Sequence, residues 1–106
     1  MPKYLIQSTY TREGVEGIRG KGGTARREAI VDMARSLGGE LESYYFGFGE
    51  YDVHAILDLP DDEAAAAVAL AVDAAGGAVA RTTVLLTPEQ VDEAARRSAD
   101  YRAPGT

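Results

Sequence analysis

Two glycine pairs, Gly38-Gly39 and Gly76-Gly77, divide this chain into alternating helical and β-forming segments. Glycine directly after a helical pattern ends the helix, because it adopts the left-handed backbone without a steric penalty. Apolar residues at helical spacing precede the first pair, and an alanine-rich segment that opens on acidic residues precedes the second. The two pairs therefore predict helices over residues 24–37 and 61–76.

Runs of β-branched and aromatic residues lie between and beyond these helices. We expect strands at residues 4–10, 40–48, 51–59 and 78–86. A tight turn near Gly49-Glu50 joins the two middle strands into a hairpin. The resulting order, β-α-β-β-α-β, is the ferredoxin-like signature of the α+β class, with a four-stranded antiparallel sheet and both helices on one face.

The C-terminal part of the chain carries one further helix. Residues 87–90, Thr-Pro-Glu-Gln, match a capping box with proline at the first helical position. They predict a helix that runs to about residue 99. We interpret residues 1–100 as a single domain and residues 101–106 as a flexible tail.

Composition argues against several classes of function. The 106-residue chain has a formal net charge of −6, which disfavours nucleic acid and anionic membranes as partners. It has no cysteine and one histidine, so we expect no disulfide, no metal site and no cofactor. The longest apolar run, residues 64–72, is too short to span a bilayer, and residues 1–10 do not resemble a secretory leader. We expect a soluble cytoplasmic protein.

A sheet with helices on one face leaves its other face open, and the alternation of side chains along each strand separates the two faces. In the third strand, the apolar set that should meet the helices is Tyr51, Val53, Ala55 and Leu57. The set that should point to the open face is Asp52, His54, Ile56 and Asp58. Gln7 and Arg81 are too polar to lie under a helix and join the open face. The second strand is ambiguous, because both alternating sets are aromatic, and we assign Tyr44 and Phe46 to the open face.

The open face mixes polar side chains with an apolar set. Its apolar members are Leu5, Tyr44, Phe46, Ile56, Val79 and Leu85. An apolar patch in water usually marks an interaction site, and polar groups inside such a patch need hydrogen-bond partners, water or a ligand. We therefore expect a homodimer that pairs two open faces around a ligand site. The expected ligand-binding residues are Gln7, Tyr44, Phe46, Asp52, His54 and Arg81.

The hairpin sequence carries a family resemblance. Gly49-Glu50-Tyr51-Asp52, preceded by YYFGF and followed by VHAILDLPDDEAAAA, resembles the GYD-domain family. The segments GGTARREAI and RTTVLLTPEQVDEA extend the resemblance over nearly the whole chain. The resemblance implies a ferredoxin-like fold of the dimeric α+β barrel type. It implies no reaction, so no catalytic role is carried over.

Three polar residues of the open face have more than one interpretation. His54 is the candidate catalytic acid or base, because imidazole exchanges a proton near neutral pH, or it hydrogen-bonds Gln7 or a group of a partner chain. A role as a haem ligand is a further alternative for the same residue. Asp52 either orients His54 or accepts hydrogen bonds from turn amides. Arg81 either clamps a carboxylate or enolate oxygen, or pairs with Asp52 or Asp58 of the same or a partner chain.

The glycine-rich segment GIRGKGGTARRE, residues 17–28, is not a nucleotide-binding P-loop. Val15 and Gly22 stand where that motif needs glycine and serine or threonine. We expect a mobile flap over the sheet, next to a solvated helix end at Thr24. The alternative is an anion-binding helix start at Thr24, with Arg26 and Arg27 nearby.

These features favour a homodimeric small-molecule-binding protein whose pocket lies on the open face. The alternative from another class is a cofactor-independent enzyme, such as an isomerase, cyclase or monooxygenase, that uses His54 for proton transfer. A third interpretation is a structural dimer whose faces fill one another. The volume of any cavity on the open face separates the third interpretation from the others, because a ligand pocket usually needs about 300 Å³.

Overall fold

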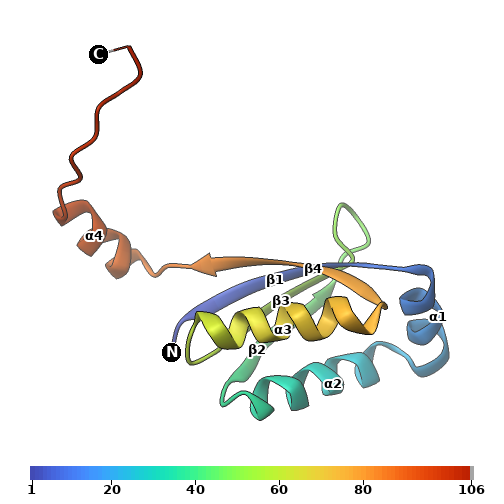
Figure 1. Ribbon diagram of the computed structural model, residues 1–106. Coiled ribbons are helices and arrows are strands. Elements are labelled where there is room, and N and C mark those ends of the chain that lie inside the picture. Colours follow the sequence, from blue (N-terminus) through green and yellow to red (C-terminus); the bar gives the residue numbers. More distant parts are fainter. Residues whose placement is uncertain (106) are drawn as a thin grey trace.

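The computed structural model describes residues 1–105, which form a four-stranded sheet and four helices (Figure 1). The strands are β1 (Lys3–Tyr10), β2 (Glu40–Phe46), β3 (Val53–Asp58) and β4 (Ala78–Leu85). The helices are α1 (Arg12–Lys21), α2 (Gly23–Ser36), α3 (Asp62–Ala75) and α4 (Pro88–Arg96). Neighbouring strands are antiparallel, in the order β2-β3-β1-β4. This is the ferredoxin-like arrangement, and it confirms the predicted α+β class.

Helices α2 and α3 cover one face of the sheet and leave the other face open (Figure 1). Alternate strand residues and small helix residues build the core between them. Its buried members are Tyr4, Ile6, Ala34, Val53, Ala55, Leu57, Leu59, Ala64, Ala65 and Val68. Because every second residue of β1 and β3 is committed to this core, the intervening residues must point to the open face.

Helix α3 begins and ends where the sequence predicts. The Asp61 carboxylate accepts a hydrogen bond from the Ala64 N–H at 2.8 Å, which caps the first turn. Gly76 ends the helix in the left-handed conformation, with φ of 79°. The short side chains of the intervening alanines let α3 lie close to the sheet.

The glycine-rich segment, residues 17–28, is helical at every residue except Gly22, so the prediction of a flap is wrong. The predicted helix end at Thr24 is replaced by a start of α2 at Gly23. Thr11 caps α1 by accepting a hydrogen bond from the Gly14 N–H. The Thr11 N–H and hydroxyl also donate to the carbonyls of Gly77 and Gly76, at 2.9 and 2.8 Å. Gly14 permits this close approach, because a Cβ there would overlap the Gly77 carbonyl oxygen. Capping and tertiary contacts at one end of α1 thus outweigh the low helix propensity of its glycines.

The β2–β3 connection is a loop over residues 47–52 rather than the predicted tight turn. The Gly47 N–H donates to the Asp52 carbonyl at 3.0 Å and closes the loop. Phe48 has a positive φ of 49° and stacks on Phe46, with ring centroids 5.8 Å apart. The loop rises on the open-face side of the sheet (Figure 1). As a consequence β3 begins at Val53, two residues later than predicted.

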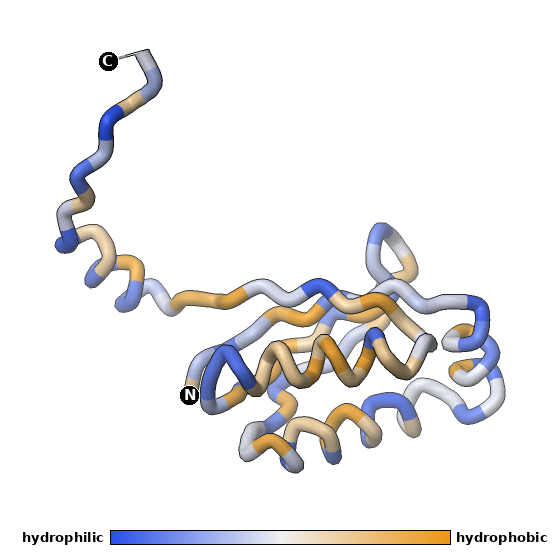
Figure 2. Tube along the Cα trace, in the orientation of Figure 1, coloured by the Kyte–Doolittle hydropathy of each residue, from blue (hydrophilic) through white to orange (hydrophobic). Residues whose placement is uncertain are grey.

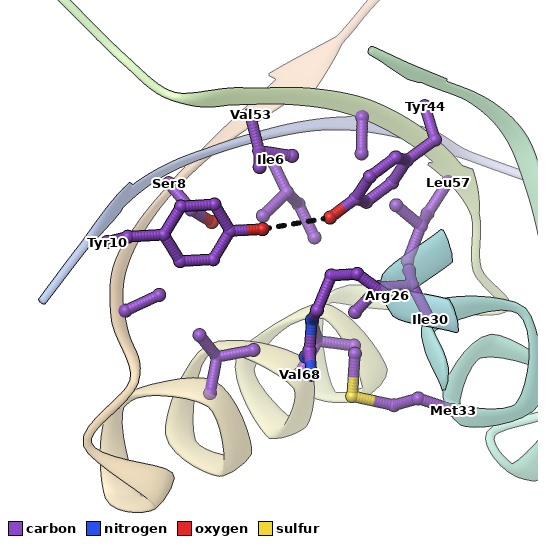
Figure 3. A pocket seen from close by; sticks show the side chains of 13 residues that line it. Ile6, Ser8, Tyr10, Arg26, Ile30, Met33, Tyr44, Val53, Leu57 and Val68 are labelled. Atoms are coloured by element: carbon purple, nitrogen blue, oxygen red, sulfur yellow. Dashed lines mark hydrogen bonds between the residues drawn. The ribbon is translucent and has the colours of Figure 1, made fainter. Parts of the chain in front are cut away.

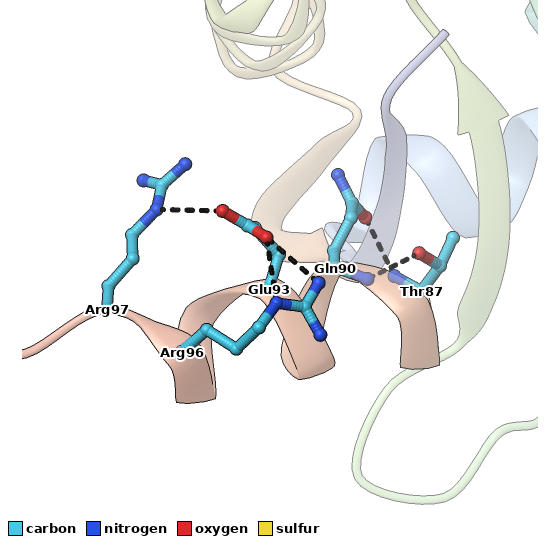
Figure 4. Close-up of polar contacts among 5 residues, drawn as sticks. All are labelled: Thr87, Gln90, Glu93, Arg96 and Arg97. Carbon is cyan, nitrogen blue, oxygen red and sulfur yellow. Dashed lines mark hydrogen bonds and ion pairs between the residues drawn. The ribbon is translucent and has the colours of Figure 1, made fainter.

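Helix α4 stands beyond the end of β4, away from the body of the molecule (Figure 1). The predicted capping box is confirmed, since Thr87 and Gln90 exchange side-chain-to-backbone hydrogen bonds of 2.8 and 3.1 Å (Figure 4). The helix ends at Arg96, earlier than predicted. The chain then continues without helix or strand to a turn at residues 104–105. Thr106, the last residue of the predicted tail, lies outside the described residues.

Candidate functional site

A row of polar side chains crosses the open face of the sheet. Gln7 of β1 lies opposite His54 of β3 on one side and opposite Arg81 of β4 on the other. Tyr45 of β2 lies opposite His54 and extends the row to the far strand. Neighbouring strands are about 4.8 Å apart, so adjacent members of the row can contact one small ligand. We call Tyr45, His54, Gln7 and Arg81 the polar row.

His54 lies within this row, next to the hairpin loop. Its Nδ1 is 3.3 Å from Gln7 Nε2, which confirms the predicted hydrogen bond between the two side chains. The Tyr51 ring meets the imidazole edge to face, with centroids 6.3 Å apart. A Cβ at Gly47 would lie 2.9 Å from His54 Nε2, so glycine leaves room for the ring. Tyr51, which we predicted to face the helices, contacts His54 instead, because it precedes the regular part of β3.

Arg81 is exposed and forms no ion pair with any carboxylate among residues 1–105. Asp58, one partner that we considered, pairs with Lys3 at 2.8 Å. Asp52, the other, binds a backbone amide. The guanidinium is therefore available to an anionic group of a ligand or to a carboxylate of another chain.

Asp52 has a structural role at the end of the sheet. Its Oδ2 accepts a hydrogen bond from the Tyr10 N–H at 2.9 Å, and its own N–H donates to the Ser8 carbonyl at 2.8 Å. These bonds extend the β1–β3 pairing beyond the Ser8–Val53 pair, since Val53 is the first residue of β3. They favour the backbone-binding interpretation of Asp52, although the bound amide belongs to β1 and not to the turn.

Tyr44 and Phe46 lie on the helix-covered face, so their assignment to the open face is wrong. Both are paired with buried residues of β3, and both pack against the core. The cause is a shift of register between Leu41 and Ser43. Such a bulge puts two residues opposite one and inverts the alternation that follows it. Tyr45, which the sequence analysis left out of the site, takes the open-face position beside His54.

A small cavity lies on the helix-covered side of the sheet (Figure 3). Its lining is mostly apolar, and its polar groups come from Ser8, Tyr10, Arg26 and Tyr44. The hydroxyls of Tyr10 and Tyr44 are 3.2 Å apart and share a hydrogen bond. Burial, together with this hydrogen bond, raises the pKa of Tyr10 above its usual range. The Tyr10 phenol therefore stays protonated at neutral pH.

The size of this cavity limits what it can hold. Its volume is about 40 Å³, whereas a water site needs about 10–15 Å³ and a small-molecule site about 300–1,000 Å³. The cavity thus suits water rather than a metabolite, and the open face remains the candidate ligand site. No local pattern in the sequence predicts the cavity, because its lining comes from all four strands and both covering helices.

Residues 1–105 contain no group of three or more His, Cys, Asp or Glu side chains that could hold a metal ion. No helix among them is long and apolar enough to cross a membrane.

The fold and the polar row together define a small α+β protein with one exposed sheet face. The family model described as the GYD domain matches residues 4–95, and the chain belongs to this family. No curated protein and no solved structure matches the chain. The matched segment contains the hairpin residues Tyr51 and Asp52. Tyr51 contacts His54, and Asp52 accepts a hydrogen bond from β1.

Proposed function

We propose that this chain is a homodimeric small-molecule-binding protein, with its ligand site between two open sheet faces at the polar row. The observation that supports this proposal best is the register that aligns Gln7, His54 and Arg81 across three strands. These residues are far apart in the sequence, and the alignment gives one surface a cation, an amide and an imidazole.

Exposed apolar side chains beside the polar row favour a second copy as its cover. Val79 is 57% exposed and Tyr45 is 69% exposed, while Leu5 and Ile56 are partly exposed. Removing apolar surface from water contributes about 25 cal/mol per Å². The same surface is present on every copy, so a two-fold dimer covers both faces with one set of contacts.

The chemistry of the polar row favours a small, partly apolar anion. Arg81 provides a positive charge that has no carboxylate partner among residues 1–105, and the Gln7 amide provides hydrogen bonds. Tyr45 provides an exposed aromatic ring for an apolar or planar group. We therefore propose small aromatic or keto carboxylic acids as the ligand class.

The first experiment measures mass and ligand binding in the same preparation. Sedimentation at micromolar concentration should give twice the chain mass. A thermal-shift screen of aromatic and keto acids should then identify a ligand, because a ligand at a hundred times its Kd stabilises by about 2.7 kcal/mol. A monomer would contradict the dimer, and a dimer that no compound stabilises would favour the pocketless structural dimer.

Substitutions in the row then test how the ligand is held. Arg81→Gln should weaken binding of an acid by about tenfold or more, because a hydrogen bond to a charged group contributes about 1.5–3 kcal/mol. Arg35→Gln, at an exposed position of α2, removes the same charge elsewhere and should leave the affinity unchanged. Equal effects of the two substitutions would contradict a role for Arg81.

His54→Gln separates the binding protein from the alternative enzyme. If His54 only contacts the ligand, the substitution should cost about 1–2 kcal/mol of affinity or less. If His54 transfers a proton, turnover should fall by about a hundredfold to ten-thousandfold while binding survives.

The cytoplasmic location is likewise a proposal, which cell fractionation tests.

A further inference from the structure

Helix α4 is well formed but has no buried residue. All nine residues from Pro88 to Arg96 are exposed, including Val91 at 52%. Its capping box and the ion pairs of Glu93 with Arg96 and Arg97 are local (Figure 4). Isolated helices shorter than about 12–15 residues are marginal in water, even in favourable sequences. A stable α4 therefore needs a surface to pack against.

The sequence of α4 has one apolar side suited to such packing. Its apolar residues recur at helical spacing and form a stripe, which consists of Pro88, Val91, Ala94 and Ala95. Its charged residues form the opposite arc, which consists of Glu89, Asp92, Glu93 and Arg96. This division is typical of a helix that lies on another protein surface.

Apolar surface continues from α4 towards the end of β4. We call the chain beyond β4, residues 86–105, the arm. Leu86, directly after β4, is 58% exposed. Figure 2 shows hydrophobic residues in the segment that leads from the sheet to α4. A half-open hollow of about 600 Å³ lies beside Leu86, lined by Met1, Pro2, Lys3, Leu85, Leu86, Thr87 and Gln90. The side-chain oxygens of Thr87 and Gln90 serve the capping box. Four of the seven lining residues are apolar, so the hollow offers mainly apolar contact.

The shape of the chain shows that the arm extends away from the body of the molecule. The radius of gyration is 16.7 Å, whereas about 13 Å is typical of a compact chain of 100 residues. Beyond α4, the tail runs towards the side of the sheet opposite to α2 and α3, which is the side of the open face (Figure 1). The tail beyond α4 thus lies on the side where the proposed dimer has its second copy.

From these observations we infer that α4 is a clasp, which packs its apolar stripe on the second copy of the chain. The inference rests on the proposed dimer and adds a contact to it. Two-fold symmetry makes the contact reciprocal, so that each copy covers the arm of the other. A membrane surface is a poorer occupant, because the chain has a net charge of −6 and the polar arc is mainly acidic.

A matched pair of full-length variants tests the clasp. Val91→Gln puts a polar helix-forming residue in the stripe, and Asp92→Gln puts the same residue in the charged arc. Val91→Gln should raise the dimer dissociation constant by about tenfold or more, since it removes a buried valine from each of two contacts. Asp92→Gln should leave the constant within about twofold. Hydrogen exchange should show the α4 amides protected in the dimer and not in the monomer.

Each outcome supports or overturns the clasp. The expected difference between the variants, with protected α4 amides in the dimer, supports it. Equal dissociation constants, or unprotected α4 amides in a dimer, overturn the clasp and leave the proposed dimer intact. Amides that are protected at monomer concentrations also overturn it, because the chain's own body would then cover α4. A wild-type chain that stays monomeric overturns the dimer and the clasp together.

Discussion

At the scale of single residues, Tyr51 and Asp52 of the hairpin have structural contacts that cannot be read from the sequence. Asp52 binds the Tyr10 amide, and Tyr51 touches the His54 ring. A residue of the segment that carries the family resemblance can thus have a structural contact. Here Asp52 joins the hairpin to β1, and this places His54 opposite Gln7.

Substitution of Asp52 tests this role. Asp52→Ala leaves the part-buried Tyr10 N–H without its side-chain acceptor and should lower the free energy of unfolding by about 1–3 kcal/mol. Asp52→Asn keeps a carbonyl acceptor at the same place and should lose less than about 1 kcal/mol. Urea unfolding measures both values. Equal losses for the two variants would mean that the carboxylate charge, and not the hydrogen bond, stabilises the fold.

The raised pKa values of two tyrosines predict how the stability of the fold changes at alkaline pH. The hydrogen bond from the Tyr4 hydroxyl to Asp62 raises the pKa of Tyr4 to about 12, and burial raises the pKa of Tyr10 as well. Both pKa values exceed the ordinary value of 10.0, so the folded state holds these protons longer than the unfolded state. Their contribution to stability is complete below pH 10 and is lost as the pH rises towards 12.

Unfolding measured at several pH values between 9 and about 11 checks this prediction. Stability should fall with pH, and Tyr4→Phe should make the fall shallower because one of the two protons is removed. Tyr101→Phe, at an exposed position of the tail, is the control and should not change the slope. A slope that Tyr4→Phe leaves unchanged would show that other groups cause the alkaline instability.

At the scale of elements, α1 shows how one contact can decide whether a glycine-rich segment is helical. Its capping residue, Thr11, is hydrogen-bonded to the turn between α3 and β4, and Gly14 lies against Gly77. The glycines of this segment are therefore not equivalent. Gly14 is needed for close packing against Gly77, whereas Gly17 and Gly20 only lower the helix propensity.

Two glycine substitutions in α1 should have opposite effects. Gly14→Ala should destabilise the protein by about 1–3 kcal/mol, because the new Cβ overlaps a backbone oxygen that cannot easily move. Gly17→Ala meets no atom within 4 Å and should stabilise it by about 0.5–1 kcal/mol through helix propensity. Thermal unfolding measures both shifts. The same sign for both variants would contradict the docking of α1 on Gly77.

At the scale of the whole molecule, the sheet has one face covered within the chain and one face that the proposed dimer covers. Val79 on the open face and Leu70 on α3 are both exposed, at 57% and 72%. Val79 lies on the open face of the sheet, whereas Leu70 lies on a helix that covers the opposite face. A new charge at either position should therefore leave the folded monomer intact, since neither contributes to the core.

Charged substitutions at these two positions locate the interface. Val79→Asp should weaken the dimer strongly, by about a hundredfold in dissociation constant, because it buries a new carboxylate in an apolar contact. Leu70→Asp should leave the dissociation constant unchanged. Sedimentation gives the constants, and circular dichroism checks that both variants keep their fold. A dimer that only Leu70→Asp disrupts would place the interface on α3 instead of the open face.

The sequence by itself determined the order of the four strands, the two helices that cover the sheet, the caps of α3 and α4, and the faces of β1, β3 and β4, because these follow from local backbone preference and regular alternation. Only the tertiary structure decided three other features. The bulge after Leu41 exchanged Tyr45 for Tyr44 and Phe46, since one extra residue inverts every later position of a strand. Docking on Gly77 made α1 a helix, and the α4 arm lies outside the monomer's core. Each depends on contacts between residues distant in sequence, which periodicity does not encode.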